Sequence, residues 1–293
     1  MKVIVTGSQG QVGKRIVELL NLRSDINVFP FTRNDLDITN ENQVNEVLGF
    51  IKPDVVINSA AYTAVERAES EERHCYAINR DGAKNLAVAV NLLGALLLHI
   101  STDYVFDGTQ LQPYKESDVA APKNVYGKSK LAGEIAIAEH CDRYAILRTA
   151  WVFDENGNNF VKTMLNLGRR KNSLDVVCDQ IGGPTYSLDI ASTLIIMMDY
   201  FIQKSSTPSG IYHYSGLPHV SWHEFACTIF DVSQRKNIIS ELPKINKIKA
   251  EQYPSLVFRP KNSCMNCDLI EEVFNIKPSN WYDALENIEN YIL

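Results

Sequence analysis

The stretch from residue 2 to residue 22 constrains the fold of this chain more than any other part of the sequence. A short run rich in β-branched residues, 2–6, leads directly into Gly7-x-x-Gly10-x-x-Gly13, and residues 11–22 repeat apolar side chains at helical spacing. A tight turn from a strand into a helix needs glycine, and glycine also lets a pyrophosphate approach the N–H groups at the helix start. The spacing is GxxGxxG rather than GxGxxG, but its place between strand and helix predicts a dinucleotide-binding loop.

The first half of the chain alternates between short apolar runs and helical patterns. We expect strands at 2–6, 26–31, 54–58, 95–100 and 144–148, and helices at 11–22, 40–50, 71–93 and 125–140. This alternation predicts an α/β fold, a Rossmann-type doubly wound parallel sheet with a smaller C-terminal substrate-binding part. We therefore expect residues 1–150 to form the NAD(P)-binding Rossmann domain, with later segments returning to it. Residues 151–293 are expected to form mainly the substrate-binding domain.

The second half of the chain is less regular. Helical patterns are expected at 159–168 and 187–201, and short strands at 176–177 and 211–214. A polar loop follows at 203–210. The tail from residue 239 contains several prolines and finishes in a charged, helix-like segment, 281–293.

Charge and hydropathy restrict the partners that the chain can have. The 29 Lys and Arg residues against 35 Asp and Glu residues give a net charge of −6, so no general attraction to nucleic acid or to an anionic membrane is expected. Asn91 and His99 interrupt the most apolar segment, 86–100, which is too short to span a bilayer. Six cysteines lie scattered among apolar segments and the chain starts with a strand-like run, so we expect a cytoplasmic protein with reduced thiols.

A pair of residues on the predicted helix 125–140 indicates acid–base chemistry. Tyr126 and Lys130 are four residues apart and therefore share one helix face. A lysine cation beside a phenol lowers the pKa of the phenol and makes it a usable acid or base. A chance pair on a solvated helix is the alternative.

Hydroxyl groups at Ser101 and Thr102 directly follow the predicted strand 95–100. Ligands bind at such strand ends in open α/β sheets, although a polar turn would look the same.

Taken together, these features resemble the extended short-chain dehydrogenase/reductases. The segments that carry the resemblance are VTGSQGQVG (5–13), LDIT (36–39), PDVVINSAAYTAVERAES (53–70), the stretch around Asn79, STDYVFDG (101–108), NVYGKSKLAGE (124–134), RTAWVF (148–153), GNNFVKTM (157–164), DQIGGPT (179–185) and RPKNS (259–263). They cover nearly the whole chain. Within the superfamily, the chain is most similar to the branch that completes dTDP-L-rhamnose synthesis. The resemblance thus implies NAD(P)H-dependent reduction of the C4 ketone of dTDP-4-dehydro-L-rhamnose.

The resemblance also implies a catalytic set, Thr102, Tyr126 and Lys130. In such a set Tyr126 gives a proton to the C4 oxygen, Lys130 holds the nicotinamide ribose and lowers the pKa of Tyr126, and Thr102 hydrogen-bonds the carbonyl oxygen. Besides the glycines Gly7, Gly10 and Gly13, the implied cofactor contacts are Gln11, Val12, Asp37, Ile38, Ala60, Ala61, Tyr62, Tyr126 and Lys130.

Candidate substrate contacts gather after the predicted strands. Thr102 itself and the next two residues, Asp103 and Tyr104, are candidates for the sugar. Asn159 and Arg259 are candidates for the nucleotide pyrophosphate. Trp151 could cover a sugar or a base, or could equally be a half-buried core residue. Gln180 and Thr185 could line the pocket or form a structural turn.

The residue that meets the adenosine ribose decides between the two nicotinamide cofactors. Arg33 lies about 20 residues past the glycine loop, just after the predicted strand 26–31, and suits the 2′-phosphate of NADP. Thr32 could add a hydroxyl donor, and Asp35 is expected to belong to the following turn. We therefore expect NADPH to be preferred, with some use of NADH.

Other functions compete with a reductase. The regulatory subunit of methionine adenosyltransferase is similar in sequence class without being catalytic, and a nucleotide-sugar epimerase would use a tightly held NAD without net oxidation.

Cys264-x-x-Cys267 has a metal-like spacing, but no second pair or nearby histidine completes a set, so no metal is expected. We interpret His99 as a packed core residue. A homodimer that pairs through the helices 71–93 and 125–140 is a further expectation.

Overall fold

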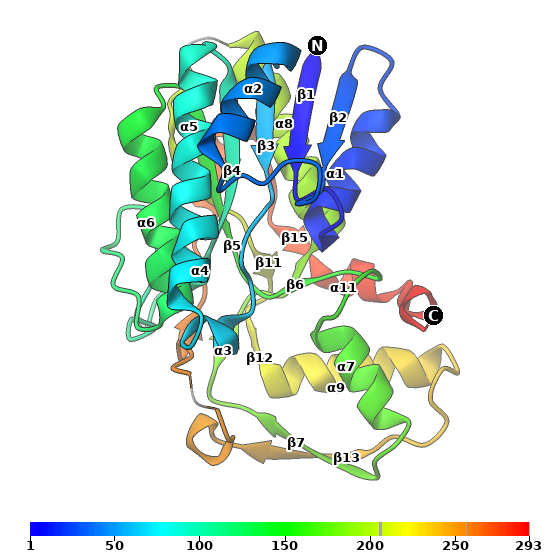
Figure 1. Ribbon diagram of the computed structural model, residues 1–293. Coiled ribbons are helices and arrows are strands. Elements are labelled where there is room, and N and C mark those ends of the chain that lie inside the picture. The colour runs from blue at the N-terminus through cyan, green and yellow to red at the C-terminus, as the bar shows by residue number, and fades with distance from the viewer. Residues whose placement is uncertain (205–206, 256, 293) are drawn as a thin grey trace.

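A six-stranded parallel sheet forms the larger part of the molecule in the computed structural model, which describes residues 1–204, 207–255 and 257–292 (Figure 1). Its strand order is β10-β5-β4-β3-β1-β2. The strands are β1 (Lys2–Thr6), β2 (Asn27–Phe31), β3 (Val55–Asn58), β4 (Leu96–Thr102), β5 (Tyr144–Thr149) and β10 (Gly210–His213). The first five come from the first half of the chain, while β10 returns to the sheet from the second half.

Helices cover both faces of this sheet because its strands are apolar on both sides. Val3 and Val5 pack with α1 (Gln11–Asn21), α8 (Ser187–Gln203) and α10 (Asp268–Phe274), whereas Ile4 packs on the opposite face. That opposite face is covered by α2 (Glu41–Ile51), α5 (Ala83–Leu92) and α6 (Val125–His140). The predicted Rossmann-type doubly wound α/β fold is therefore confirmed.

A smaller lobe lies at the carboxyl ends of the sheet strands (Figure 1). It contains α7 (Phe160–Gly168), α9 (Trp222–Arg235) and the parallel pair β7 (Ser173–Val177) and β13 (Lys244–Ile248), packed around Phe153, Phe225 and Trp281. Its shorter elements are β6 (Val152–Phe153), β8 (Ile181–Gly182), β9 (Thr185–Tyr186), β11 (Gly216–Leu217), β12 (Val220–Ser221), β14 (Asn262–Ser263), β15 (Ser279–Asn280) and α11 (Trp281–Leu285). The boundary between this lobe and the sheet lies where parallel α/β sheets bind ligands.

The segment 71–93 departs from the single long helix that was expected. It consists of α4 (Glu72–Tyr76), a π-helical turn at Ala77–Gly82 and α5. Asn79 lies in that turn, and its side chain is hydrogen-bonded to the backbone of Tyr62. A short helix, α3 (Val65–Ala68), precedes α4 in the chain. The extra residue of a π turn re-aims side chains, which is common at functional sites.

Several other predictions need correction. Strand β4 continues to Thr102, so Ser101 and Thr102 are its last residues rather than the start of a loop. The helix α9, the strand β13 and the helix α10 were not predicted at all. The expected terminal helix is α11 followed by a 3₁₀ turn at Ile288–Tyr291, and Leu293 lies outside the described residues. Residues 205 and 206 of the expected polar loop also lie outside them, and Gln203 belongs to α8. Within the described ranges, no helix has the length and apolar character needed to cross a membrane.

Candidate active site

The glycine loop between β1 and α1 is shaped to receive an anion. Gly7 has φ +66°, and a Cβ atom there would lie 2.6 Å from the backbone nitrogen of Ala60, so only glycine fits. Gly10 is the N-cap of α1 and makes no side-chain cap, and the first helical turn contains no acidic residue. A helix start that is uncapped by side chains attracts phosphate, so the loop fits a dinucleotide pyrophosphate. Gly13 and the buried Val12 continue into α1.

The loop after β3 lies against the glycine loop and is fixed by buried amides. Ala60 donates its backbone N–H to Oδ1 of Asn58 over 3.1 Å. Asn79 accepts from the backbone nitrogen of Tyr62 over 2.8 Å and donates to the oxygen of the same residue over 3.1 Å. Ala60 is therefore held beside Gly7, and the backbone of Tyr62 is fixed by Asn79. An aspartate carboxylate at position 79 could accept from the N–H of Tyr62 but could not donate to its carbonyl oxygen. An amide does both, which explains the asparagine at this position.

The turn after β2 leaves Arg33, the residue predicted to choose between the two nicotinamide cofactors, exposed to solvent. Arg33 is exposed, while Thr32 donates its hydroxyl to Asp35 over 2.6 Å. Asp35 thus belongs to the turn, and the hydroxyl of Thr32 is engaged within it. Further along, the Asp37 carboxylate accepts from the hydroxyl of Thr39 over 2.7 Å.

Ile38 is buried next to the π-helical turn. A Cβ atom on Gly82 would lie 2.6 Å from its side chain, so the two residues are in close contact. Ile38 therefore forms part of the wall behind the loop that contains Asp37.

Thr102, Tyr126 and Lys130 come together where β4 ends against α6. Asn124 caps α6 by accepting from the backbone nitrogen of Gly127, and Gly127 packs so tightly that a Cβ atom would lie 2.1 Å from the carbonyl oxygen of Tyr104. This close approach brings the Tyr126 phenol near the Thr102 hydroxyl, close enough for that hydroxyl to affect the pKa of the phenol. The rings of Tyr104 and Tyr126 meet edge to face with centroids 5.6 Å apart.

The ionisation of Tyr126 runs opposite to the expectation from its spacing with Lys130. Burial raises the pKa of Tyr126 well above that of a free phenol, although the Thr102 hydroxyl opposes the shift. The expected lowering by Lys130 is wrong in this structure because Nζ of Lys130 turns toward β4. There it donates to the carbonyl oxygen of Ile100 over 2.6 Å and lies 3.1 Å from Nε2 of His99. Tyr126 is consequently a protonated phenol at neutral pH.

His99 is a site residue that the sequence analysis interpreted only as core. It is buried as expected, but it contacts Lys130 through Nε2 and Asn58 through Nδ1. Burial lowers the pKa of Lys130 to about 8 and holds the pKa of His99 well below its usual range. Asn58 ends an apolar run and His99 interrupts one, and a polar group in such a place is the pattern that could have revealed them.

Asp103 and Tyr104 directly follow Thr102, and Arg259 lies near Tyr104. Thr102 donates its hydroxyl to Oδ1 of Asp103 over 2.9 Å, and burial raises the pKa of Asp103 to about 6. Burial also raises the pKa of Tyr104 to about 12, while the nearby Arg259 cation opposes the shift. Arg259 pairs with Glu66 over 2.5 Å, which brings a cation from the C-terminal part of the chain to this side of the site.

Trp151 is half-buried and stacked rather than free. Its φ of +48° is unusual for a non-glycine residue, and its ring lies flat on Trp222 with centroids 3.4 Å apart. A Cβ atom on Gly182 would lie 2.5 Å from Cε2 of this indole, so the ring also packs closely against Gly182. Gln180 is buried just before β8. Thr185 donates to the carbonyl oxygen of Gly183, so its hydroxyl serves the turn.

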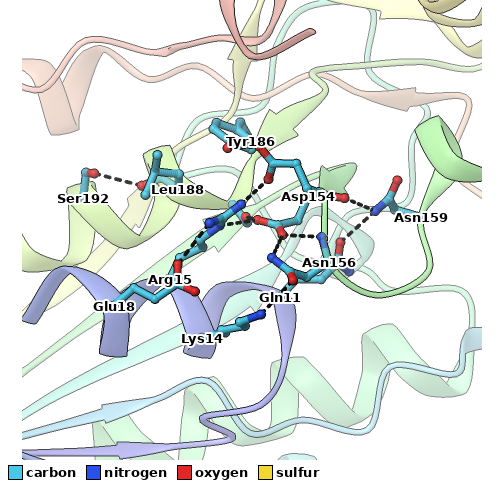
Figure 2. A network of polar contacts seen from close by, with 12 residues as sticks. Gln11, Lys14, Arg15, Glu18, Asp154, Asn156, Asn159, Tyr186, Leu188 and Ser192 are labelled. Atoms are coloured by element: carbon cyan, nitrogen blue, oxygen red, sulfur yellow. Dashed lines mark hydrogen bonds and ion pairs between the residues drawn. The ribbon is translucent and has the colours of Figure 1, made fainter. Parts of the chain in front are cut away.

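Asn159 lies beside the glycine loop but its side chain is already engaged. It caps α7 by accepting from the backbone nitrogen of Lys162, and its amide donates to Gln11 and to the backbone of Asp154 (Figure 2). Asp154 is fully buried and pairs with Arg15 on α1 over 2.8 Å. The network in Figure 2 therefore fastens the segment that precedes α7 to the helix that starts at the glycine loop.

The cysteine pair near the C-terminus forms no disulfide. Cys264 and Cys267 are both free and buried. In the part of the chain that the structure describes, no three His, Cys, Asp or Glu side chains are grouped so that they could hold a metal ion.

Comparisons with known proteins agree with this geometry over the whole chain. The model of the RmlD substrate binding domain family matches residues 1–292. A dTDP-4-dehydrorhamnose reductase from Aggregatibacter actinomycetemcomitans is 44% identical over 290 residues, which cover 99% of each chain. The chain belongs to the dTDP-4-dehydrorhamnose reductase family. The family member from Bacillus anthracis, solved in complex with NADP, is 40% identical, covers 98% of this chain and 99% of its own, and superposes with a TM-score of 0.88. The family member from Clostridium acetobutylicum is 38% identical, with 98% of each chain covered and a TM-score of 0.90.

Proposed function

We propose that this protein reduces the C4 ketone of dTDP-4-dehydro-L-rhamnose to dTDP-L-rhamnose with NADPH as the electron donor. The observation that carries the proposal is the convergence of Thr102, Tyr126 and Lys130 at the end of β4, beside an uncapped helix start that fits a dinucleotide. The relative from Aggregatibacter actinomycetemcomitans is named a dTDP-4-dehydrorhamnose reductase, and the Bacillus anthracis structure contains NADP.

The catalytic residues then act on the oxygen of the ketone. When bound, the nicotinamide cofactor supplies the hydride for C4. Tyr126 gives its phenolic proton to the C4 oxygen, and the raised pKa of Tyr126 ensures that this proton is present at neutral pH. The Thr102 hydroxyl turns from Oδ1 of Asp103 and donates its hydrogen bond to the same oxygen as negative charge builds on it. Lys130 holds the nicotinamide ribose with the N–H groups that the carbonyl of Ile100 leaves free.

On the cofactor side, the glycine loop and the first turn of α1, with Gln11 and Val12, hold the pyrophosphate. Asp37, Ile38 and the residues 60–62 complete the cofactor pocket. Arg33 reads the 2′-phosphate, which favours NADPH while leaving NADH usable. The exposed position of Arg33 supports this role, because a bound 2′-phosphate would keep partial contact with solvent.

On the substrate side, Asp103 and Tyr104 adjoin the sugar, and Trp151 covers the sugar or the base. Gln180 lines the same pocket, and Asn159 and Arg259 approach the diphosphate. The Arg259 guanidinium is the better supported of these two, because the amide of Asn159 is used by Gln11 and Asp154. Residues 1–150, joined by β10, form the cofactor-binding part in this proposal, and 151–293 supply mainly the substrate-binding part.

Two broader expectations belong to the same proposal. We place the protein in the cytoplasm, which the six free cysteines support. We also propose a homodimer that pairs through the outer faces of α5 and α6, where Ile135 is 50% exposed on α6. A mass close to one chain in light scattering at micromolar concentration would contradict the dimer.

An assay of NADPH consumption tests the function itself. The 4-keto sugar nucleotide is generated in situ by the preceding enzymes, and the loss of NADPH absorbance is followed after this protein is added. Steady oxidation in proportion to the sugar nucleotide is expected. A non-catalytic cofactor-binding subunit or an epimerase would not consume NADPH continuously, so either alternative predicts no sustained change.

A further inference from the structure

A row of buried polar side chains crosses the main sheet and ends at Lys130. Thr6, Asn58 and His99 lie opposite one another on β1, β3 and β4, and each is 1% exposed. The Thr6 hydroxyl donates to Oδ1 of Asn58 over 2.7 Å, Nδ2 of Asn58 lies 2.9 Å from Nδ1 of His99, and Nε2 of His99 lies 3.1 Å from Nζ of Lys130. Three strands thus contribute one connected hydrogen-bonded line to a proposed catalytic group.

The direction of this line is set by a backbone group. Ala60 donates its N–H to Oδ1 of Asn58 over 3.1 Å, and a backbone N–H can only donate. The oxygen of the Asn58 amide therefore faces Ala60 and Thr6, and its nitrogen faces His99. An amide nitrogen donates as well, so Nδ1 of His99 must accept. The single proton of the neutral imidazole then resides on Nε2, where it points at Lys130.

This arrangement distinguishes the two forms of Lys130. An ammonium group has three donors and no acceptor, so it would meet the Nε2–H of His99 with like polarity. A neutral amine has a lone pair that accepts this N–H, one N–H for the carbonyl oxygen of Ile100, and one more N–H for a ligand. The local hydrogen bonds therefore favour the amine.

The other titratable groups around Nζ do not reverse this preference. Cys75 faces it from α4, and Tyr126 and Glu134 lie on α6 itself. Glu134 favours the cation, but its carboxylate is bonded to Arg148 through both oxygens, over 2.9 and 2.6 Å. Burial disfavours the cation further, in keeping with a pKa of about 8 for Lys130.

We propose that Asn58 and His99 are the positioning residues of this row: Asn58, oriented by the N–H of Ala60, fixes the His99 proton on Nε2, and His99 thereby stabilises Lys130 as a neutral amine, whereas Thr6 only extends the line. Its catalytic consequence rests on the proposed function. After Tyr126 gives its proton to the substrate, a cationic Lys130 stabilises the phenolate that remains. Turnover therefore falls as pH rises through the pKa of Lys130, and the row sets where this alkaline limb lies.

Two variants of the row test the proposal. Asn58→Asp replaces the amide donor with a carboxylate, which accepts from Nδ1–H, so the His99 proton should move to Nδ1 and Nε2 should accept from the Lys130 ammonium. Thr6→Val is the matched control, because the N–H of Ala60 still orients the Asn58 amide. The tautomer is measured by ¹⁵N NMR of the imidazoles, with His99 assigned through His99→Gln, and the alkaline limb is measured from kcat/KM against pH.

The expected result is a proton on Nε2 in the wild type and in Thr6→Val, with the same alkaline limb. In Asn58→Asp the proton is on Nδ1 and the limb lies higher by about one pH unit. A wild-type proton on Nδ1 overturns the proposal whether or not any variant folds. A limb that moves without a change of tautomer also overturns it, because the added charge then suffices, as does a changed tautomer with an unmoved limb. The NMR result does not need turnover, so an inactive protein would contradict the proposed function and leave the tautomer measurable.

Discussion

At the scale of single residues, Tyr126 is the group on which the proposed chemistry depends. It is positioned by its helix, kept protonated by burial and contacted by the Thr102 hydroxyl. A phenol of this kind is an acid that releases its proton only when a substrate oxygen becomes strongly basic. Hydride addition at an adjacent carbon creates such an oxygen.

Replacing Tyr126 with phenylalanine keeps the ring and its edge-to-face contact with Tyr104 but removes the proton. We expect kcat to fall by roughly 10²–10⁴-fold, the usual contribution of a general acid. The dissociation constant for NADPH, measured by fluorescence titration, should change little and serves as the control for folding. Activity within a few-fold of wild type would remove Tyr126 from the proton-donating role.

Arg33→Ala tests the choice of cofactor. A charge-assisted hydrogen bond contributes ~1.5–3 kcal/mol, so KM for NADPH should rise roughly 10- to 100-fold while KM for NADH stays nearly constant. The two constants are obtained from initial rates with each cofactor. Equal losses for both cofactors, or a wild-type preference for NADH, would show that Arg33 does not contact the 2′-phosphate.

The pair of Tyr126 and Lys130 shows which features of single residues the sequence could predict and which it could not. Spacing alone placed Tyr126 and Lys130 on one helix face, because helical periodicity is local. It could not give the direction of Nζ of Lys130, because His99 and Ile100 come from a strand about 30 residues earlier in the chain. The pKa of Tyr126 was consequently predicted to be lowered, whereas the structure raises it.

At the scale of elements, the contact between α6 and the end of β4 assembles the site. The contact depends on Gly127, where a Cβ atom would lie 2.1 Å from the carbonyl oxygen of Tyr104. Backbone atoms form this obstacle, so a side chain cannot be accommodated by a rotamer change. The helix would have to move away from Thr102.

Gly127→Ala should therefore displace Tyr126 and lower both kcat and the melting temperature. Overpacking of this kind costs ~1–3 kcal/mol, and a shift of about 1 Å can reduce turnover roughly 10²-fold. Gly49→Ala on α2 is the matched control, because nothing lies within 4 Å of a Cβ atom there and alanine favours helices. Thermal melts and initial rates of both variants provide the measurement. Equal behaviour of the two would mean that the close approach is not needed.

Elements differed in how far they could be predicted. The helix Val125–His140 was predicted with its observed bounds, because Asn124 caps it and its pattern is uninterrupted. The segment 71–93 was not, because Asn79 leaves the helical register to bind the backbone of Tyr62, a tertiary contact. The helix α9 was missed although Ser221 and Glu224 form a capping box at its start, a local signal that was available in the sequence.

At the scale of the whole molecule, the fold buries the carboxyl of Asp103 where the sheet meets the smaller lobe. The parallel sheet was predictable because alternating strands and helices permit few other arrangements. The contacts across the boundary were not, because pairs such as Arg259 with Glu66 join segments that are far apart in sequence. Burial of Asp103 at this boundary is a cost to stability that the proposed substrate contact would justify.

Asp103 gives that cost a pH dependence. Its folded-state pKa of about 6 lies above the unfolded value of 3.8, so the unfolded chain releases this proton more readily. The free energy of unfolding therefore falls as pH rises from about 4 to about 6. Asp103→Asn should abolish this decline and be more stable than wild type at pH 7 by roughly 1–3 kcal/mol, with reduced turnover. Urea unfolding at pH 4, 5, 6 and 7 measures the difference, and parallel pH profiles for the two proteins would contradict it.

The central claim is that the C4 ketone of the sugar nucleotide receives a hydride from NADPH at the site formed by Thr102, Tyr126 and Lys130. The most direct measurement uses NADPH that carries deuterium at the transferred position of the nicotinamide, with the 4-keto sugar nucleotide as substrate. The account predicts dTDP-L-rhamnose with one deuterium at C4, located by NMR, and formation slowed by Tyr126→Phe. Product without deuterium, deuterium at another carbon, or unchanged formation by Tyr126→Phe would contradict it.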